Sequence, residues 1–159
     1  MKVHFADLER INHCNDGSWG TFYYKDEKFN GIVYDTIGDK PYWIFSVKDG
    51  LQNGTEYTFY EETDIIEQIC EYRDNHQLGI SKEFDEQGEL QSVSIIYDNS
   101  YLKTIEIDDI KVDTTLAYDD RYGDRLPSYL VSLLKLSTED LINYEFIDDN
   151  PFLTPPYTD

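Results

Sequence analysis

Few side chains in this sequence could carry catalysis, namely two cysteines, three histidines and many carboxylates. His13 and Cys14 are adjacent, and a thiolate beside an imidazole is the pair that performs nucleophilic catalysis. Catalytic pairs usually come from separate elements of a fold, so direct neighbours rarely face each other productively. Cys70 lies in a stretch that we predict to be a strand, which favours a place in the core. We therefore expect no catalytic cysteine.

Metal and cofactor sites are not indicated either. His4, His13 and Cys14 lack a fourth zinc ligand at a suitable spacing. The pair Glu61-Glu62 could exchange protons, but adjacent acids are expected by chance among 33 acidic residues. The sequence has no glycine-rich phosphate-binding motif, no Gly-x-Ser-x-Gly and no calcium-loop motif. We expect no metal and no cofactor, and a protein that is not an enzyme.

The charge of the chain indicates binding instead. The 159 residues include 33 acidic and 13 basic side chains, which gives a formal net charge of −20. A surface this negative repels nucleic acid and anionic lipid, so we expect neither nucleic acid nor a membrane as a partner. Its natural partner is a basic protein surface, although acidity could also serve only to keep the protein soluble.

Length and composition indicate one domain over residues 1–159 that is large enough to bury a core. Aromatic residues make up 15% of the chain, which favours sheets and argues against disorder. The two cysteines are far apart in sequence, which fits a reducing compartment without disulfides. The first residues contain no apolar stretch typical of a signal peptide, and we expect a cytoplasmic protein.

A repeat organises the first two thirds of the chain. Four aspartates recur at intervals of 23, 25 and 24 residues, and a glycine follows each of the first three after five residues. The aspartates are Asp26, Asp49, Asp74 and Asp98, the glycines are Gly31, Gly54 and Gly79, and Lys103 takes the fourth glycine position. A regular internal period of this length indicates one small structural unit per repeat.

Each unit has the pattern of a β-hairpin. We expect the first strand to begin at the glycine, a turn to follow, and a second strand to lead to the next aspartate. The second strands are predicted over 42–47, 65–72 and 90–97, where β-branched and aromatic residues alternate with others. The aspartate can close a turn with its own side chain, and glycine permits a positive φ. Since a lone hairpin is marginal in water, successive hairpins must pair into one sheet.

The unit of aromatic-Lys/Arg-Asp-x-x-x-x-Gly, strand, turn and strand resembles the MORN repeat in its bacterial variant form. Residues 20–103 are similar to the MORN-like antitoxin family, whose members belong to bacterial toxin–antitoxin and toxin–immunity pairs. The resemblance implies a protein that neutralises a toxin by binding it. Two departures stand out, since Gln77-Leu78 precedes Gly79 and Lys103 replaces the last glycine. We therefore expect the array to end near residue 103.

The segments outside the array complete the predicted fold. Residues 1–19 form a lead-in with an edge strand or a helical turn, and 102–112 form one more strand, bent near Asp108-Asp109. Pro127 fits the first position of a helix, and Ser137 opens a second helix that reaches about residue 144. The expected fold is mainly β with α+β character at the C-terminus. An elongated, twisted antiparallel sheet of hairpins occupies 20–103, and an acidic strand, loop, helices and Pro-rich tail occupy 104–159.

The favoured function is an immunity protein or antitoxin that binds one cognate toxin domain. A basic nuclease, a ribonuclease on charge complementarity, fits best, and the inhibitor would cover its active-site cleft as a monomer in a 1:1 complex. The alternative is a MORN-type scaffold or other protein-interaction module without a toxin partner. The sequence leaves two candidate binding surfaces open. One comprises Tyr57, Glu61, Glu62, Glu83, Asp85 and Glu86, and the other comprises Tyr118, Asp119, Asp120, Tyr122 and Asp124.

Overall fold

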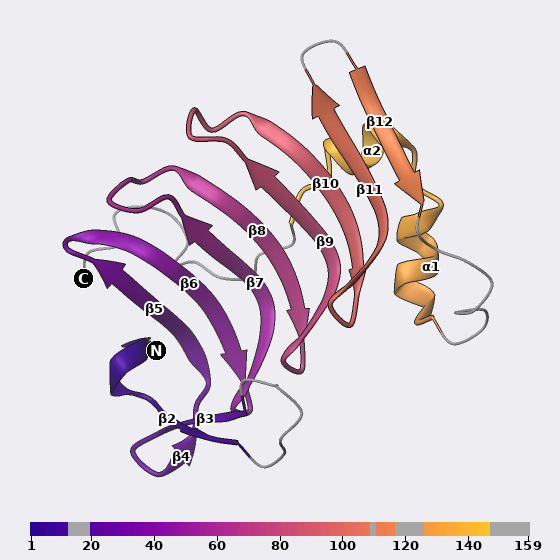
Figure 1. Cartoon of the computed structure of the whole chain (residues 1–159). Coiled ribbons are helices and arrows are strands. Elements are labelled where there is room, and N and C mark those ends of the chain that lie inside the picture. The colour runs from indigo at the N-terminus through magenta and orange to yellow at the C-terminus, as the bar shows by residue number, and fades with distance from the viewer. Residues whose placement is uncertain (13–19, 109–110, 117–125, 147–159) are drawn as a thin grey trace.

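One long antiparallel sheet dominates the structure, as the alternating runs predict (Figure 1). The computed structural model describes residues 1–12, 20–108, 111–116 and 126–146, with the backbone alone for 111–116. The strands of this sheet are β1 (Lys2–His4), β5 (Gly31–Ile37), β6 (Lys40–Lys48), β7 (Leu51–Phe59), β8 (Ile66–Arg73), β9 (His76–Phe84), β10 (Leu90–Tyr97), β11 (Ser100–Asp108) and β12 (Lys111–Leu116). They lie side by side in that order. All neighbours are antiparallel except β1, which is parallel to β5.

Smaller elements lie at the two ends of this sheet (Figure 1). At the β5 end, a three-stranded sheet contains β2 (Glu9–Ile11), β3 (Thr21–Tyr24) and β4 (Glu27–Lys28), preceded by the 3-10 helix η1 (Phe5–Asp7). At the β11 end lie the helices α1 (Ser128–Leu134) and α2 (Thr138–Ile142). The mainly β fold class with two short C-terminal helices is thereby confirmed. Neither helix is long enough to cross a membrane, and no other helix of the described residues is.

The repeated aspartates are turn residues, as predicted. Asp49, Asp74 and Asp98 each occupy the first position of a two-residue turn and have φ values of 53°, 50° and 47°. Two consecutive residues with positive φ are typical of the type I′ turns that close two-residue hairpins. Asp26 differs, because it is the second residue of its turn after Lys25. Its hairpin, β3–β4, pairs with β2, so the turn of the first repeat unit lies in the small sheet, while the strands that follow Gly31 belong to the long sheet.

Gly31 begins β5, as predicted, whereas Gly54 and Gly79 lie inside β7 and β9, so the prediction that each glycine begins a strand was wrong for those two. Gly79 lies in the middle of β9 with a φ of 125°. A Cβ atom there would lie 2.1 Å from Oε2 of Glu71, a carboxylate oxygen that accepts a hydrogen bond from the backbone N–H of Ile80 (2.7 Å). The registers of β8–β9 and of β6–β7 both shift by two residues at the bulge that each contains. The glycine therefore lies at a bulge within the hairpin that the aspartate turn closes.

The fourth unit departs from the repeat in its bulge, which explains Lys103. Between β10 and β11 the register shifts by one residue only, at Ile95/Ile96, and Lys103 lies opposite Ile95. No glycine-dependent approach is needed in this narrower bulge. The sheet continues beyond residue 103, where the sequence predicts one more strand. The single strand predicted over 102–112 consists of the two paired strands β11 and β12.

Flanking predictions were partly right. The lead-in contains both alternatives, since Val3 lies in β1 at the end of the sheet and a 3-10 turn follows it. Pro127 is the N-cap of α1 and not its first helical residue. Ser137 caps α2 as predicted, and its hydroxyl accepts the backbone N–H of Asp140 at 3.1 Å. The helix ends at Ile142.

The strand register defines two faces of the long sheet, because directly paired residues point to the same side. We call one the Trp43 face, and a row of paired positions crosses it through Asp35, Trp43, Thr58, Gln68, Glu83, Ser92 and Glu106. We call the other the helix face, and its row contains Tyr34, Ile44, Tyr57, Ile69, Lys82, Val93 and Ile105. The helix face bears Ile80, Val93, Ile95 and Ile105, which form one core with Leu130, Leu133 and Leu141 of the two helices.

Candidate functional site

The Trp43 face changes character along a single row of paired residues. This row runs from β5 to β11 through Val33, Phe45, Glu56, Cys70, Ser81, Ser94 and Thr104. Its first two members are apolar, and the following members are polar or small. On the helix face, by contrast, the paired row is aliphatic or aromatic at every position except Lys82, and it ends with Val93 and Ile105. The difference indicates two environments on one face of the same sheet.

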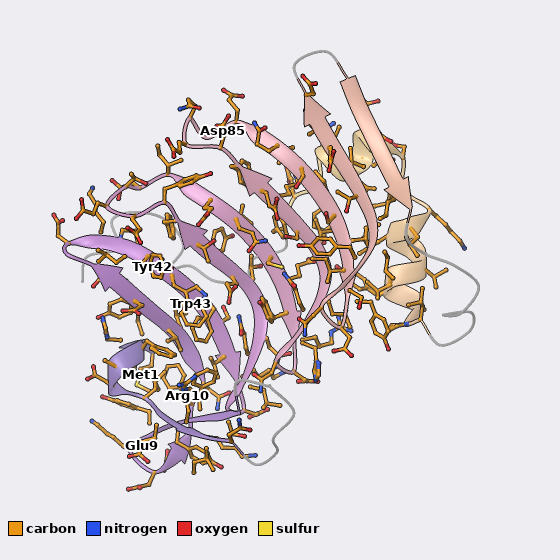
Figure 2. All side chains as sticks on the ribbon, in the orientation of Figure 1. Met1, Glu9, Arg10, Tyr42, Trp43 and Asp85 are labelled. Carbon is orange, nitrogen blue, oxygen red and sulfur yellow. The ribbon has the colours of Figure 1, made fainter. Side chains whose placement is uncertain are left out.

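Aromatic packing covers the apolar part of the Trp43 face. Phe22 of β3 lies 5.6 Å from Phe45 between ring centroids, and Trp43 lies 4.4 Å from Phe45 (Figure 2 labels Trp43). Phe29 completes this core with Val33 and Val47. Since Phe22, Phe29, Val33 and Phe45 are at most 1% exposed, the small sheet seals this region. It is a structural core and offers no open surface.

Glu56 marks the border between the two parts. It is 7% exposed, and it accepts hydrogen bonds from Gln52 Nε2 (2.5 Å) and from the side chains of Trp43 and Tyr72. Burial raises the pKa of its carboxyl group above the ordinary value, while these hydrogen bonds oppose the change. The other amide atom of Gln52, Oε1, is buried without a hydrogen-bond partner among the described residues. The border is thus a buried polar network.

Beyond Glu56 the face is polar. Gln68 Nε2 donates to Ser81 Oγ (3.2 Å), Ser92 Oγ donates to Glu83 Oε2 (3.2 Å), and the hydroxyls of Ser94 and Thr104 lie 3.1 Å apart. These bonds run across neighbouring strands, so they hold the side chains flat against the sheet. The row through Ser81 and Ser94 is buried, since these side chains are 2% and 4% exposed. Glu83 and Glu106 are exposed in the neighbouring row, the one that contains Trp43, and these carboxylates can contact water or a polar partner.

One end of this polar region is strongly acidic. We call it the acidic edge, formed by Glu61, Glu62, Asp64, Glu67, Glu83, Asp85, Glu86 and Glu89 in and beside the β7–β8 and β9–β10 turns (Asp85 is labelled in Figure 2). Tyr60 lies between the two turns, and its hydroxyl donates to the backbone carbonyl of Phe84 (2.7 Å). Burial and the charges of Glu67, Glu86, Asp85 and Glu83 raise the pKa of this hydroxyl. These carboxylates and the Tyr60 hydroxyl therefore lie near one another at this edge.

Most carboxylates of the acidic edge have no basic neighbour among the described residues. Asp64 is paired with Lys40 (Nζ to Oδ2, 2.5 Å), and the other ion pairs of those residues lie elsewhere, between His4 and Asp35 and between His76 and Asp98. Like charges held close together repel one another, and a cationic partner would relieve that repulsion. The edge is therefore suited to a basic ligand.

A hollow opens where the acidic edge meets the polar face. Its volume is about 450 Å³, and it is lined by Thr58, Tyr60, Glu67, Gln68, Glu83 and Phe84. Thr58, Gln68 and Glu83 are consecutive members of the row that crosses the Trp43 face. The hollow therefore combines two carboxylates, two neutral polar side chains and two aromatic residues.

The structure brings only some of the predicted binding residues together. Glu61, Glu62, Glu83, Asp85 and Glu86 all lie on the acidic edge. Tyr57 does not, because its register places it on the helix face, where it packs beside Ile32, Ile44 and Phe59. The second predicted surface, with Tyr118, Asp119, Asp120, Tyr122 and Asp124, lies outside the described residues.

Sequence reasoning missed Thr58, Tyr60, Glu67 and Gln68. Alternation within each strand could have shown that Thr58 and Gln68 point to the opposite face from the residues next to them in sequence. Their alignment with Glu83 depends on bulges at Thr58/Phe59 and between Cys70 and Tyr72, which periodicity alone does not reveal.

The residues first considered for catalysis are not assembled into a site in the described parts of the chain. Cys70 is 1% exposed, and burial raises the pKa of its thiol to about 12, which disfavours the reactive thiolate. No group of three His, Cys, Asp or Glu side chains in the described segments converges to hold a metal ion. Cys14 and His13 lie outside the described residues.

Comparisons with models of protein families, with curated proteins and with solved structures found no match for the chain.

Proposed function

We propose that this chain is an immunity protein that binds one cognate bacterial toxin domain and neutralises it by covering a basic active-site cleft. The observation that carries the proposal is the acidic edge, whose carboxylates mostly lack basic partners among the described residues and adjoin the polar part of the Trp43 face. The resemblance of the repeats to MORN-like antitoxins and the net charge of −20 support the same function. A nuclease, with its cleft shaped for phosphate, is the toxin class that fits best.

The mechanism is electrostatic steering followed by occlusion. A charged edge raises the rate of encounter with a basic surface and orients it before contact. The polar side chains of the Trp43 face are already held by hydrogen bonds to one another, so little side-chain entropy is lost on binding. Carboxylates would then take the positions of nucleic-acid phosphates in the cleft and exclude the substrate.

The test is co-expression with the toxin domain encoded by the neighbouring gene, together with isolation of the complex. We expect the full chain to protect the cells and to form a 1:1 complex whose association slows as salt is raised. Protection without a detectable complex would contradict neutralisation by binding. A complex without protection would instead leave the chain as an interaction module without immunity function.

Matched charge reversals connect the function to the acidic edge. The pair Glu61→Lys and Glu86→Lys changes the same charge as the pair Glu27→Lys and Glu139→Lys, and all four side chains are exposed. We expect the first pair to lower the association rate about tenfold or more, and the second pair much less. Equal effects of the two pairs would assign the interaction to net charge and not to this edge.

A further inference from the structure

The hollow beside Tyr60 has the lining of a site for one specific side chain. We propose that it receives an arginine of the protein partner, whose guanidinium group lies between Glu67 and Glu83 and against the Tyr60 ring. The inference rests on the proposed function, and it adds the residue type that anchors the complex. A pocket of about 450 Å³ is in the range of sites that hold small ligands, about 300–1,000 Å³.

The floor of the hollow is ordered by the sheet itself. Thr58, Gln68 and Glu83 stand on adjacent strands in paired positions, so their Cβ atoms are about 5 Å apart from one strand to the next. The wall is formed by Tyr60 and Phe84, which the 2.7 Å bond from the Tyr60 hydroxyl to the Phe84 carbonyl joins. The site is thus built on paired strands and needs little rearrangement before it binds.

The polar groups of the hollow are chiefly acceptors. Gln68 uses its amide nitrogen to donate to Ser81, which leaves its carbonyl oxygen as the atom for a ligand. Glu83 accepts from Ser92 with Oε2 and retains Oε1, and Glu67 contributes a second carboxylate that is exposed. Guanidinium has five N–H donors and no acceptor, which complements such a set. Its planar shape lets it contact carboxylates on two sides, whereas an ammonium group is a point charge.

Charge and aromatic contact favour the same ligand. Neither Glu67 nor Glu83 forms an ion pair within the described part of the chain. Tyr60 lines the hollow, and guanidinium groups stack well on aromatic rings. A metal ion is a weaker fit, because the described carboxylates of this edge form no three-ligand cluster.

The first experiment uses three probe peptides and the full chain. The peptides have the sequence acetyl-Gly-Ser-X-Ser-Gly-amide, where X is arginine, lysine or citrulline, and binding is followed in ¹⁵N–¹H spectra. We expect the arginine peptide to shift the backbone amides of Thr58, Gln68 and Glu83 and to bind at least fivefold more tightly than the lysine peptide. Citrulline has nearly the same shape without the charge, and it should give no saturable shift. Equal binding of lysine, or binding of citrulline, would overturn the proposal.

The second experiment compares two variants with the same loss of charge. Glu67→Gln with Glu83→Gln alters the hollow, while Glu27→Gln with Glu139→Gln alters exposed carboxylates away from it. We expect the hollow variant to bind the arginine peptide at least tenfold more weakly than the unmodified chain, and the control to differ by less than twofold. All four replacements are close in shape, and thermal unfolding checks that both variants remain folded.

The same variants separate this inference from the proposed function. If the hollow variant binds the toxin domain as tightly as the control does, the arginine site is wrong while the immunity function stands. If the unmodified chain binds the arginine peptide but no toxin domain from the neighbouring gene, the hollow stands and the immunity function fails.

Discussion

The aromatic part and the polar part of the Trp43 face belong to one sheet and differ in their side chains. Val33 and Phe45 are buried by Phe22 and Phe29, while the paired positions further along the sheet are polar. A second apolar layer over β8–β11 would need apolar residues on this face, and Ser81 and Ser94 stand in their place. The strand pattern therefore determines that a sheet forms, and the choice of residue at each paired position determines whether its face packs as an aromatic core or as a layer of hydrogen-bonded polar side chains.

The largest effect on stability should come from a substitution in the aromatic part of the Trp43 face. Phe45→Ala removes a ring that is 1% exposed and contacts both Phe22 and Trp43. We expect a loss of about 3–5 kcal/mol in the free energy of unfolding, measured by urea denaturation. Ser94→Ala, in the same row of the polar part, should cost no more than about 1.5 kcal/mol, since it loses one hydrogen bond to Thr104. Similar losses for both would contradict the difference between the two parts.

The next largest effect on stability is expected on the helix face, at Lys82. Lys82 on the helix face is 8% exposed, and its Nζ atom donates to the backbone carbonyls of Ile142 (2.7 Å) and Tyr144 (2.8 Å) at the end of α2. Burial lowers the pKa of this amine. Lys82→Met keeps the aliphatic part and leaves two carbonyls without a donor, at a cost of about 2–3 kcal/mol. Hydrogen exchange should quicken in α2 first, and unchanged exchange there would contradict a role for Lys82 in holding the helix.

Much of the fold could be predicted from sequence, and the reasons for the misses are physical. Turn chemistry at Asp49, Asp74 and Asp98 is local, so spacing and residue type identify the hairpins. The bulges are not local, because they depend on contacts such as that between Glu71 and Gly79 across two strands. Each bulge shifts the register, so alternation along the sequence does not predict which face of the sheet a residue occupies. For this reason the sequence groups Tyr57 with the acidic residues, whereas the register places it on the helix face.

A smaller effect, on the pH dependence of stability, is expected at Glu56, which lies between the aromatic and the polar parts of the Trp43 face. Because burial raises the pKa of Glu56 in the folded state, the folded protein binds more protons than the unfolded chain between the two pKa values. The contribution of Glu56 to stability therefore falls as pH rises through that window. Glu56→Gln removes this dependence, so the variant should gain stability relative to the unmodified chain from pH 4 to pH 8, with a difference within about 1 kcal/mol at pH 7.

The measurement for Glu56 is urea denaturation of both proteins over that pH range. Glu106→Gln, an exposed acid on the same face, serves as the control and should show no such trend. A relative stability of Glu56→Gln that stays constant or declines with rising pH would show that the hydrogen bonds from Gln52, Trp43 and Tyr72 outweigh burial.

The smallest effect on stability is expected at the acidic edge, where we propose that the partner binds. Glu83→Gln replaces an exposed carboxylate that has no basic partner in the described chain, so the free energy of unfolding should change by less than about 0.5 kcal/mol. Repulsion from the neighbouring acids is relieved, and a small gain is as consistent as no change. A loss above about 1 kcal/mol would mean that Glu83 supports the fold through its contact with Ser92. A substitution that leaves stability unchanged but weakens partner binding identifies a recognition surface, whereas a substitution in a core lowers stability.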